Sequence, residues 1–365
     1  MPALLGAHPE MSHNYVYSLI IGMAVVLATD AERDQAFQAA RNVLLLFMAA
    51  SLLLIAVEPT LVLDTAYRQG LLPGVPRLTG LAAHAVSLGI LGQLGLLCLL
   101  AYPFRRAWLN RLGWLIGLTV LFLAQSKTTW ISLILCALCI LGVRRGSAVW
   151  RQLGDPVRPE AGMLTVVGFM LAVLGLSLVL MFGDLGARLD TFLRSSEGAQ
   201  LASLTGRDQI WAIAWQEWRQ HPVFGYGPQI WEADFRISIG MPNATHAHNQ
   251  FMDTLSRSGT VGAVALVGYA LVLLALSLRH ARASRGMSLA LFVALAIRSH
   301  SEVPLSLFGY GAELLTHLLL LMTLAAASQR RARSVPVRPA RAAQSAFPHP
   351  PTATEPPMAS PGYGA

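Results

Sequence analysis

His248 and Asn249 are followed, nine residues later, by Gly-Thr-Val-Gly at 259–262. The same polar stretch holds Arg207 and a glycine-rich turn at 222–227. A neutral histidine can accept a proton from a hydroxyl group, and an arginine can bind a phosphate through paired hydrogen bonds. These residues therefore predict a site that binds an anion and activates a hydroxyl group.

Arg207 is expected in the first turn of a helix. Thr205 and Asp208 have the spacing of a capping box, with Asp in place of Glu, so the helix should begin after Thr205 and run to about Gln220. An arginine beside the free N–H groups of a helix start is disfavoured until an anion binds there. The alternative interpretation is a local salt bridge, for example to Asp208.

Trp211, Trp215 and Trp218 form an aromatic stripe on this helix. Tryptophans at such spacing usually pack on a helix bundle or lie at the lipid interface. Stacking on a sugar ring is the alternative role for them.

His246 and His248 have a spacing that could suit a metal ion. No cysteine is close in the sequence and the only nearby carboxylate is Asp253, so we expect neither a metal nor another cofactor. His248 is the candidate general base, and the alternative is a helix-start histidine bonded to a neighbour. His246 and Asn249 are candidate substrate-binding residues.

Gly225 and Gly227 follow His221 and Pro222, which should end the helix. Glycines in a tight turn let the backbone approach another group closely. Both are candidate substrate-binding positions, and a purely structural turn is the other interpretation.

Lys127 is the only lysine in the chain and lies between two apolar runs. A lysine at a membrane boundary can serve as an anchor whose ammonium group reaches water. It can also face a cavity and bind an anion, because ionisable groups within membranes are usually functional.

The elements that must position these residues are predicted to be membrane helices. The chain of 365 residues is 54% apolar and 13% charged, with a mean hydropathy of +0.52. These values predict an all-α polytopic membrane protein with about nine spans. The expected spans lie near 15–29, 42–57, 79–101, 111–126, 128–143, 162–183, 259–278, 287–299 and 310–327.

The arginines cluster at the ends of alternate spans, which predicts cytoplasmic loops there. The long segment 184–258 should then be a periplasmic loop containing short helices. Since topology explains the net charge of +8, we expect no nucleic-acid partner. The multi-span domain should cover 1–327, and the Pro-rich segment 328–365 should be a disordered cytoplasmic tail that contacts membrane lipids.

The span count places the N-terminus outside, yet residues 1–14 have no basic signal-peptide region. We therefore expect further spans upstream in the natural protein or its relatives.

The motifs together resemble the O-antigen ligase superfamily, which also includes O-antigen and exopolysaccharide polymerases and protein O-oligosaccharyltransferases. The resemblance is strongest over 203–275, through His-Asn-x9-Gly-x-x-Gly, Thr-Gly-Arg before a Trp-containing helix, and Pro-x-x-Gly-x-Gly. Ser126-Lys127 stands where relatives commonly have Ser-Arg, which keeps the charge but loses the bidentate fork. Arg77 opens an Arg-x-x-Gly similar to another recurring motif, although the Asn that usually follows is absent from 84–87.

The resemblance implies a metal-independent membrane glycosyltransferase in the bacterial inner membrane, with its active site facing the periplasm. Such an enzyme moves a glycan from a polyprenyl-diphosphate donor to a hydroxyl of lipid A-core or of a growing polysaccharide. Arg207 and Lys127, with Arg77 third, would stabilise the diphosphate, and His248 would activate the acceptor. The alternative is a transporter or flippase for a polysaccharide precursor or small anion.

Overall fold

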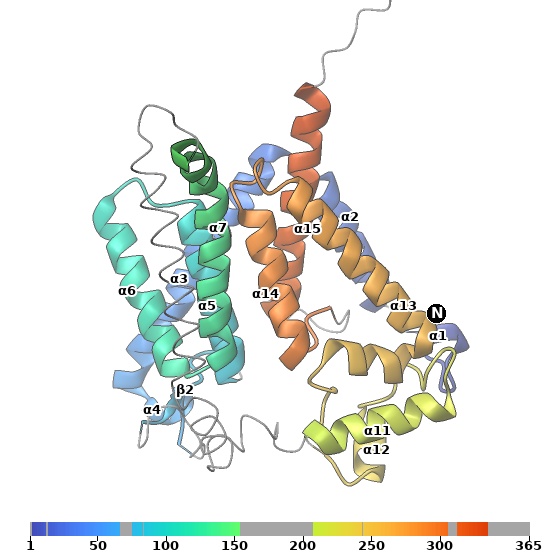
Figure 1. The fold of residues 1–365 in the computed structure, drawn as a ribbon. Coiled ribbons are helices and arrows are strands. Elements are labelled where there is room, and N and C mark those ends of the chain that lie inside the picture. Colours follow the sequence, from blue (N-terminus) through green and yellow to red (C-terminus); the bar gives the residue numbers. More distant parts are fainter. Residues whose placement is uncertain are drawn as a thin grey trace, which may run out of the picture.

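The computed structural model describes residues 2–11, 14–65, 75–82, 84–153, 207–242, 244–305 and 312–334. Most of them are helical, in two groups of long helices with shorter helices at one end (Figure 1). The helices are α1 (Pro2–Leu5), α2 (Asn14–Leu27), α3 (Asp30–Val57), α4 (Pro59–Val62), α5 (Ala85–Ala101), α6 (Ala107–Ala124), α7 (Lys127–Leu153), α11 (Arg207–Gln220), α12 (Ala233–Ser238), α13 (Gln250–Arg279), α14 (Met287–Ser301) and α15 (Ala312–Ser334).

One small strand pair accompanies the helices. Strands β1 (Leu63–Asp64) and β2 (Arg77–Leu78) pair antiparallel, with Asp64 opposite Arg77. Two-residue strands are too short to show the alternation that would predict them. The fold is otherwise helical, as the composition indicates.

Five of the described helices are long and apolar enough to cross a membrane: α3, α6, α7, α13 and α15. Helices α5 and α14 are apolar but shorter. The predicted span 162–183 lies outside the described residues, as do 184–206 of the predicted loop and 335–365 of the tail. The count of nine spans therefore stays a prediction.

Several helix boundaries differ from the sequence prediction, and three of the differences have a clear physical reason. Helix α3 begins twelve residues early because Thr29 and Glu32 form a capping box there. Helix α13 begins at Gln250 rather than 259, because the Asn249 side chain caps it. Helix α15 continues to Ser334, past the predicted start of the tail at 328, since Ala, Gln and Arg favour helix there.

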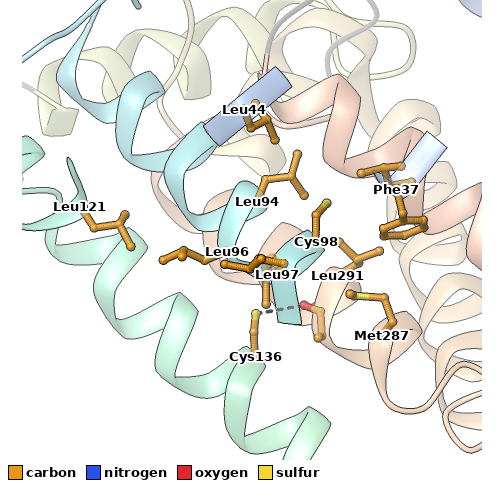
Figure 2. Packing of buried hydrophobic residues seen from close by; sticks show 14 of the residues in the cluster. Phe37, Leu44, Leu94, Leu96, Leu97, Cys98, Leu121, Cys136, Met287 and Leu291 are labelled. Carbon is orange, nitrogen blue, oxygen red and sulfur yellow. Dashed lines mark hydrogen bonds between the residues drawn. The ribbon is translucent and has the colours of Figure 1, made fainter. Parts of the chain in front are cut away.

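Helix α5 lies at the centre of one bundle and is buried on nearly all sides. Leu94 and Leu97 on α5 pack toward Leu44 of α3 and Leu291 of α14 (Figure 2). Figure 2 also shows Cys136 of α7 bonded to a carbonyl of α14, through a contact of 3.1 Å from Sγ to the Ala290 oxygen. A helix that is apolar all round is expected in a core, whereas α13 presents many exposed apolar residues, as a lipid-facing helix does.

The starts of α5, α7, α13 and α15 and the end of α14 lie at the same end of the bundle as α11 and α12 (Figure 1). The arginine-bearing loop between α13 and α14 lies at the opposite end. The N-terminal segment joins the first of these ends, because the Ala7 and His8 N–H groups donate to the carbonyls of Gly225 and Tyr226. The predicted site residues thus gather away from the arginine-rich loops.

Candidate functional site

A cavity of about 680 Å³ opens between the start of α5, the segment before α12, the start of α13 and the end of α14. Polar and titratable side chains form much of its wall. They include His84, Ser87, Glu232, Thr245, His246, His248, Asp253, Arg257, Glu302 and Glu313.

The backbone of Ala247 is hydrogen-bonded through both its carbonyl and its N–H group. The Trp211 indole of α11 donates to the Ala247 carbonyl at 2.8 Å, and the Asp253 carboxylate accepts from the Ala247 N–H at 3.2 Å. Asp253 is fixed in turn by Arg257, at 3.2 Å. Trp211 therefore supports the backbone between His246 and His248 and helps to position both histidines.

His248 occupies a left-handed backbone conformation, with φ 49°. Such a conformation is uncommon outside glycine and is found most often where surrounding structure holds it in place. The next residue, Asn249, caps α13 by accepting from the Met252 N–H at 3.0 Å. Its amide nitrogen also lies 3.4 Å from the His300 carbonyl. Asn249 therefore has a structural role, since it turns the chain from His248 into the helix, and its substrate-binding role stays a prediction.

Glu302 is the site residue that the sequence did not single out. It follows α14 and lies more than fifty residues from the histidines, but its Oε2 atom is 3.6 Å from His246 Nε2 and 3.5 Å from His248 Nδ1. The two imidazole rings are themselves in edge contact, with centroids 4.1 Å apart. Asp253, the nearest carboxylate in the sequence, instead supports the backbone.

The charge states of His246 and Glu302 follow from their surroundings. Burial, assisted by His248, lowers the pKa of His246 below its ordinary value of 6.5, so this ring is neutral at pH 7. Burial would raise the pKa of Glu302, but His248, His246 and Arg207 outweigh it and lower the pKa below 4.5. An ionised carboxylate thus faces two histidines.

His246, His248 and Glu302 also have the donor types of a metal site, with one ligand atom from each within 4.8 Å of the others. The His246 Nδ1 atom, however, accepts a hydrogen bond from the His248 N–H at 3.1 Å. In a neutral imidazole one ring nitrogen accepts hydrogen bonds and the other carries the hydrogen. Because Nδ1 of His246 accepts, its Nε2 carries the hydrogen and donates toward Glu302. The chemistry of this donor set fits a hydrogen-bonded cluster better than a metal site.

Arg207 is the first residue of α11, which ends at Gln220 as predicted. Thr205 and Gly206 lie outside the described residues. Arg207 is close enough to act on the pKa of both His246 and Glu302. The structure therefore brings Arg207 and the histidine cluster together, although Arg207 does not line the cavity itself.

Gly225 and Gly227 take part in backbone packing rather than lining the cavity. A Cβ at Gly225 would lie 2.6 Å from the Gly259 nitrogen, and one at Gly227 would lie 2.3 Å from the His8 oxygen. Gly259 breaks α13 at φ 63°, and the N–H groups of Thr260 and Val261 bond to carbonyls of the 222–223 turn instead of their own helix. The structural interpretation of both glycines is thus the one that their contacts support.

Lys127 begins α7 and is exposed, whereas Arg77 is buried. Arg77 Nε donates to the Ala124 carbonyl at 3.2 Å, so it stabilises the end of α6 just before the Lys127 turn. This turn packs on α5, because a Cβ at Gly89 would lie 3.1 Å from Ser126 Cβ. Neither cation lines the cavity, but the start of α5 is one of its walls.

Residues 112–267 match a family model described as O-antigen ligase, a stretch that includes Lys127, Arg207 and His248 but neither Arg77 nor Glu302. This match confirms the resemblance drawn from the motifs. No curated protein matches the chain. A solved structure titled "Structural coordination of polymerization and crosslinking by a peptidoglycan synthase complex" is similar at 19% identity and a TM-score of 0.38, covering 88% of each chain. A TM-score of this size does not establish a shared fold.

Proposed function

We propose that this chain is a metal-independent membrane glycosyltransferase, because residues 112–267 match a family model described as O-antigen ligase. It moves a glycan from a polyprenyl-diphosphate donor to an acceptor hydroxyl. The domain and the apolar helices support a membrane protein with a glycosyl-transferring role in polysaccharide biosynthesis. The donor, acceptor and mechanism are the parts that we propose.

In the proposed reaction, the acceptor oxygen attacks the anomeric carbon of the donor glycan. The bond from that carbon to the diphosphate oxygen breaks, and the diphosphate leaves with the electron pair. His248 takes the proton of the acceptor hydroxyl. Arg207 and Lys127 stabilise the negative charge that develops on the leaving diphosphate.

The observation that carries this proposal is the cavity itself. It places His248 beside an ionised carboxylate, with Arg207 near enough to act on both, at the end of the bundle away from the arginine-rich loops. A base for the acceptor and a cation for the leaving group are the two components that the reaction needs. The cavity is also large enough to hold parts of both substrates.

We further propose that this end faces the periplasm across the bacterial inner membrane. Cysteine replacing Ile237, which is 68% exposed on α12, should react with an impermeant thiol reagent in cells with a permeabilised outer membrane. Cysteine replacing the exposed Ala283, in the loop between α13 and α14, should not. The reverse labelling pattern would overturn the proposed orientation.

The acceptor is either lipid A-core or a growing polysaccharide. Deleting the gene and analysing the envelope glycans distinguishes the two. Lipid A-core without attached glycan would indicate a ligase, and loss of long polymer with single repeat units retained would indicate a polymerase.

The same experiment tests the alternative of a transporter or flippase, which predicts precursor trapped on the cytoplasmic side. One buried arginine, Arg298 of α14, does lie inside the described bundle. Its guanidinium donates to Gln93 at 2.8 Å and to Thr316 at 3.1 Å. These bonds tie α14 to α5 and α15, which favours a structural role over a transport path.

A further inference from the structure

We propose that Glu302 is a positioning residue that holds the ring hydrogen of His248 on Nδ1 and leaves His248 Nε2 free to accept the substrate proton. This inference rests on the proposed role of His248 as the base. It adds a residue that lies outside the stretch matched by the family model.

The first step concerns His246. Its Nδ1 accepts the His248 N–H at 3.1 Å, so the ring hydrogen of the neutral form must be on Nε2. That nitrogen is 3.6 Å from Glu302 Oε2. His246 therefore points a donor at the carboxylate and helps to keep it in place.

The second step concerns His248. Its Nδ1 atom is buried and has, among the described residues, no closer hydrogen-bond partner than the same Oε2 atom, at 3.5 Å. Because the side chain is 29% exposed in total, its accessible part lies away from Nδ1. An ionised carboxylate beside Nδ1 favours hydrogen on that nitrogen, which places the lone pair on Nε2.

The contact between Glu302 and His248 is at the long end of hydrogen-bond range. Catalytic hydrogen bonds are often long before substrate binds and shorten in the reacting complex. As His248 takes the acceptor proton, it becomes positively charged, and its attraction to the Glu302 carboxylate grows. Glu302 thus stabilises the charge that forms during transfer without receiving the proton itself.

The other charged groups around the cluster do not replace Glu302. Asp253 of α13 is engaged by the Ala247 N–H and by Arg257. Arg207 of α11 acts on both Glu302 and His246 and favours the ionised carboxylate. Glu313 of α15 lines the cavity and, like Glu302, is close enough to Arg298 to interact with its charge.

The backbone holds Glu302 in a fixed place relative to the histidines. The Glu302 N–H donates to the Arg298 carbonyl at 2.7 Å, so the residue continues the end of α14. The Gln250 side chain of α13 accepts from the Leu305 N–H at 2.7 Å. Since α13 starts immediately after His248, these bonds join the two sides of the cluster.

Transfer by purified protein in lipid vesicles tests the proposal. We expect Glu302→Gln to lower kcat about 100-fold or more, because an amide cannot favour Nδ1–H over Nε2–H as a carboxylate does. The affinity of Glu302→Gln for a polyprenyl-diphosphate glycan should differ from that of the wild type by less than threefold. Glu302→Asp should restore part of kcat, and Glu58→Gln, which alters an exposed carboxylate outside the cavity, should transfer at nearly the wild-type rate.

Solid-state ¹⁵N spectra of histidine-labelled protein give a readout independent of transfer. His248 signals, assigned by their loss in His248→Gln, should show a protonated Nδ1 in the wild type and a different tautomer in Glu302→Gln. A wild-type His248 with unprotonated Nδ1, a normal kcat for Glu302→Gln, or stoichiometric zinc bound through the cluster would each overturn the inference. Normal transfer by His248→Ala would instead overturn the proposed function. The tautomer of His248 in the wild-type spectra would still test the effect of Glu302 separately.

Discussion

The histidine cluster (His246, His248 and Glu302) and the Lys127 turn (Ser126 and Lys127) both contain motif residues. They differ in the contacts that the surrounding residues make. At the cluster, Trp211, Asp253 and Asn249 hold the backbone, and His248 faces a cavity. At the Lys127 turn, the buried Arg77 is bonded to a helix end and the lysine itself is exposed.

This difference shows that a charged motif residue can either bind substrate or stabilise the helix bundle. The contacts of its side chain distinguish the two roles. Arg77 and Arg298 are buried and bonded within the bundle, so their guanidinium groups stabilise helix ends and helix packing. Arg207 and Lys127 are the two cations that we propose bind the diphosphate. The predictions below separate these roles.

Among the residues proposed to bind the diphosphate, the largest effect is expected for Arg207→Ala. Loss of a donor to the developing diphosphate charge typically lowers the rate about 100- to 1000-fold, and donor binding should weaken as well. Transfer and donor affinity are measured with purified protein in lipid. Arg219→Ala, at the other end of the same helix, is the matched control; equal loss in both variants would remove Arg207 from the site.

Lys127 should show a smaller loss that depends on charge. Lys127→Ala should reduce transfer about 10- to 100-fold with normal folding, and Lys127→Arg should retain much of the activity. Arg77→Ala should behave differently, with a stability loss of about 1–3 kcal/mol from the buried carbonyl it leaves unpaired. Wild-type transfer by Lys127→Ala would identify Lys127 as a membrane anchor.

Trp211→Phe should have a modest effect, because it removes one hydrogen bond and keeps most of the aromatic packing. A lost bond of about 0.5–1.5 kcal/mol corresponds to a rate reduction of about 10-fold at most. Trp215→Phe, on an exposed part of the same helix, should be neutral. If Trp211→Phe loses no activity in steady-state assays, the Ala247 peptide does not need this support.

The smallest effect is a pH dependence of stability. The pKa of His246 is lowered in the folded state, so its contribution to stability is complete above its ordinary value of 6.5 and is lost as pH falls below it. Glu302 begins to lose its contribution only below 4.5. The wild-type Tm should therefore drop between pH 7.5 and 5.5 more than that of His246→Gln; equal drops would contradict the assignment.

Much of the fold could be predicted from hydropathy. Every predicted span within the described residues coincides with an apolar helix, because long apolar runs have few other structures available in a membrane. Polar turns at Thr29 and Asn249 extend α3 and α13 ahead of their apolar parts, and in α13 the break at Gly259 lies at the predicted start of the span.

The site was predictable where its residues are close in the sequence and not where they meet through folding. His246, His248 and Arg207 form recognisable motifs, and the structure brings them together. Glu302 belongs to no such motif, and only the packing of α14 against α13 places it beside them. A carboxylate at the end of a predicted span, on the same side as the motifs, was the one available signal.

The most direct test of the account compares donor binding and transfer for His248→Ala in lipid vesicles. We predict near-normal affinity for the polyprenyl-diphosphate glycan and a rate reduced about 100- to 10,000-fold, the range expected for loss of a general base. Both should be unaffected by chelators in the wild type. Loss of donor binding with normal transfer at saturating donor would contradict the role of His248, and chelator inhibition reversed by Zn²⁺ would contradict the metal-independent mechanism.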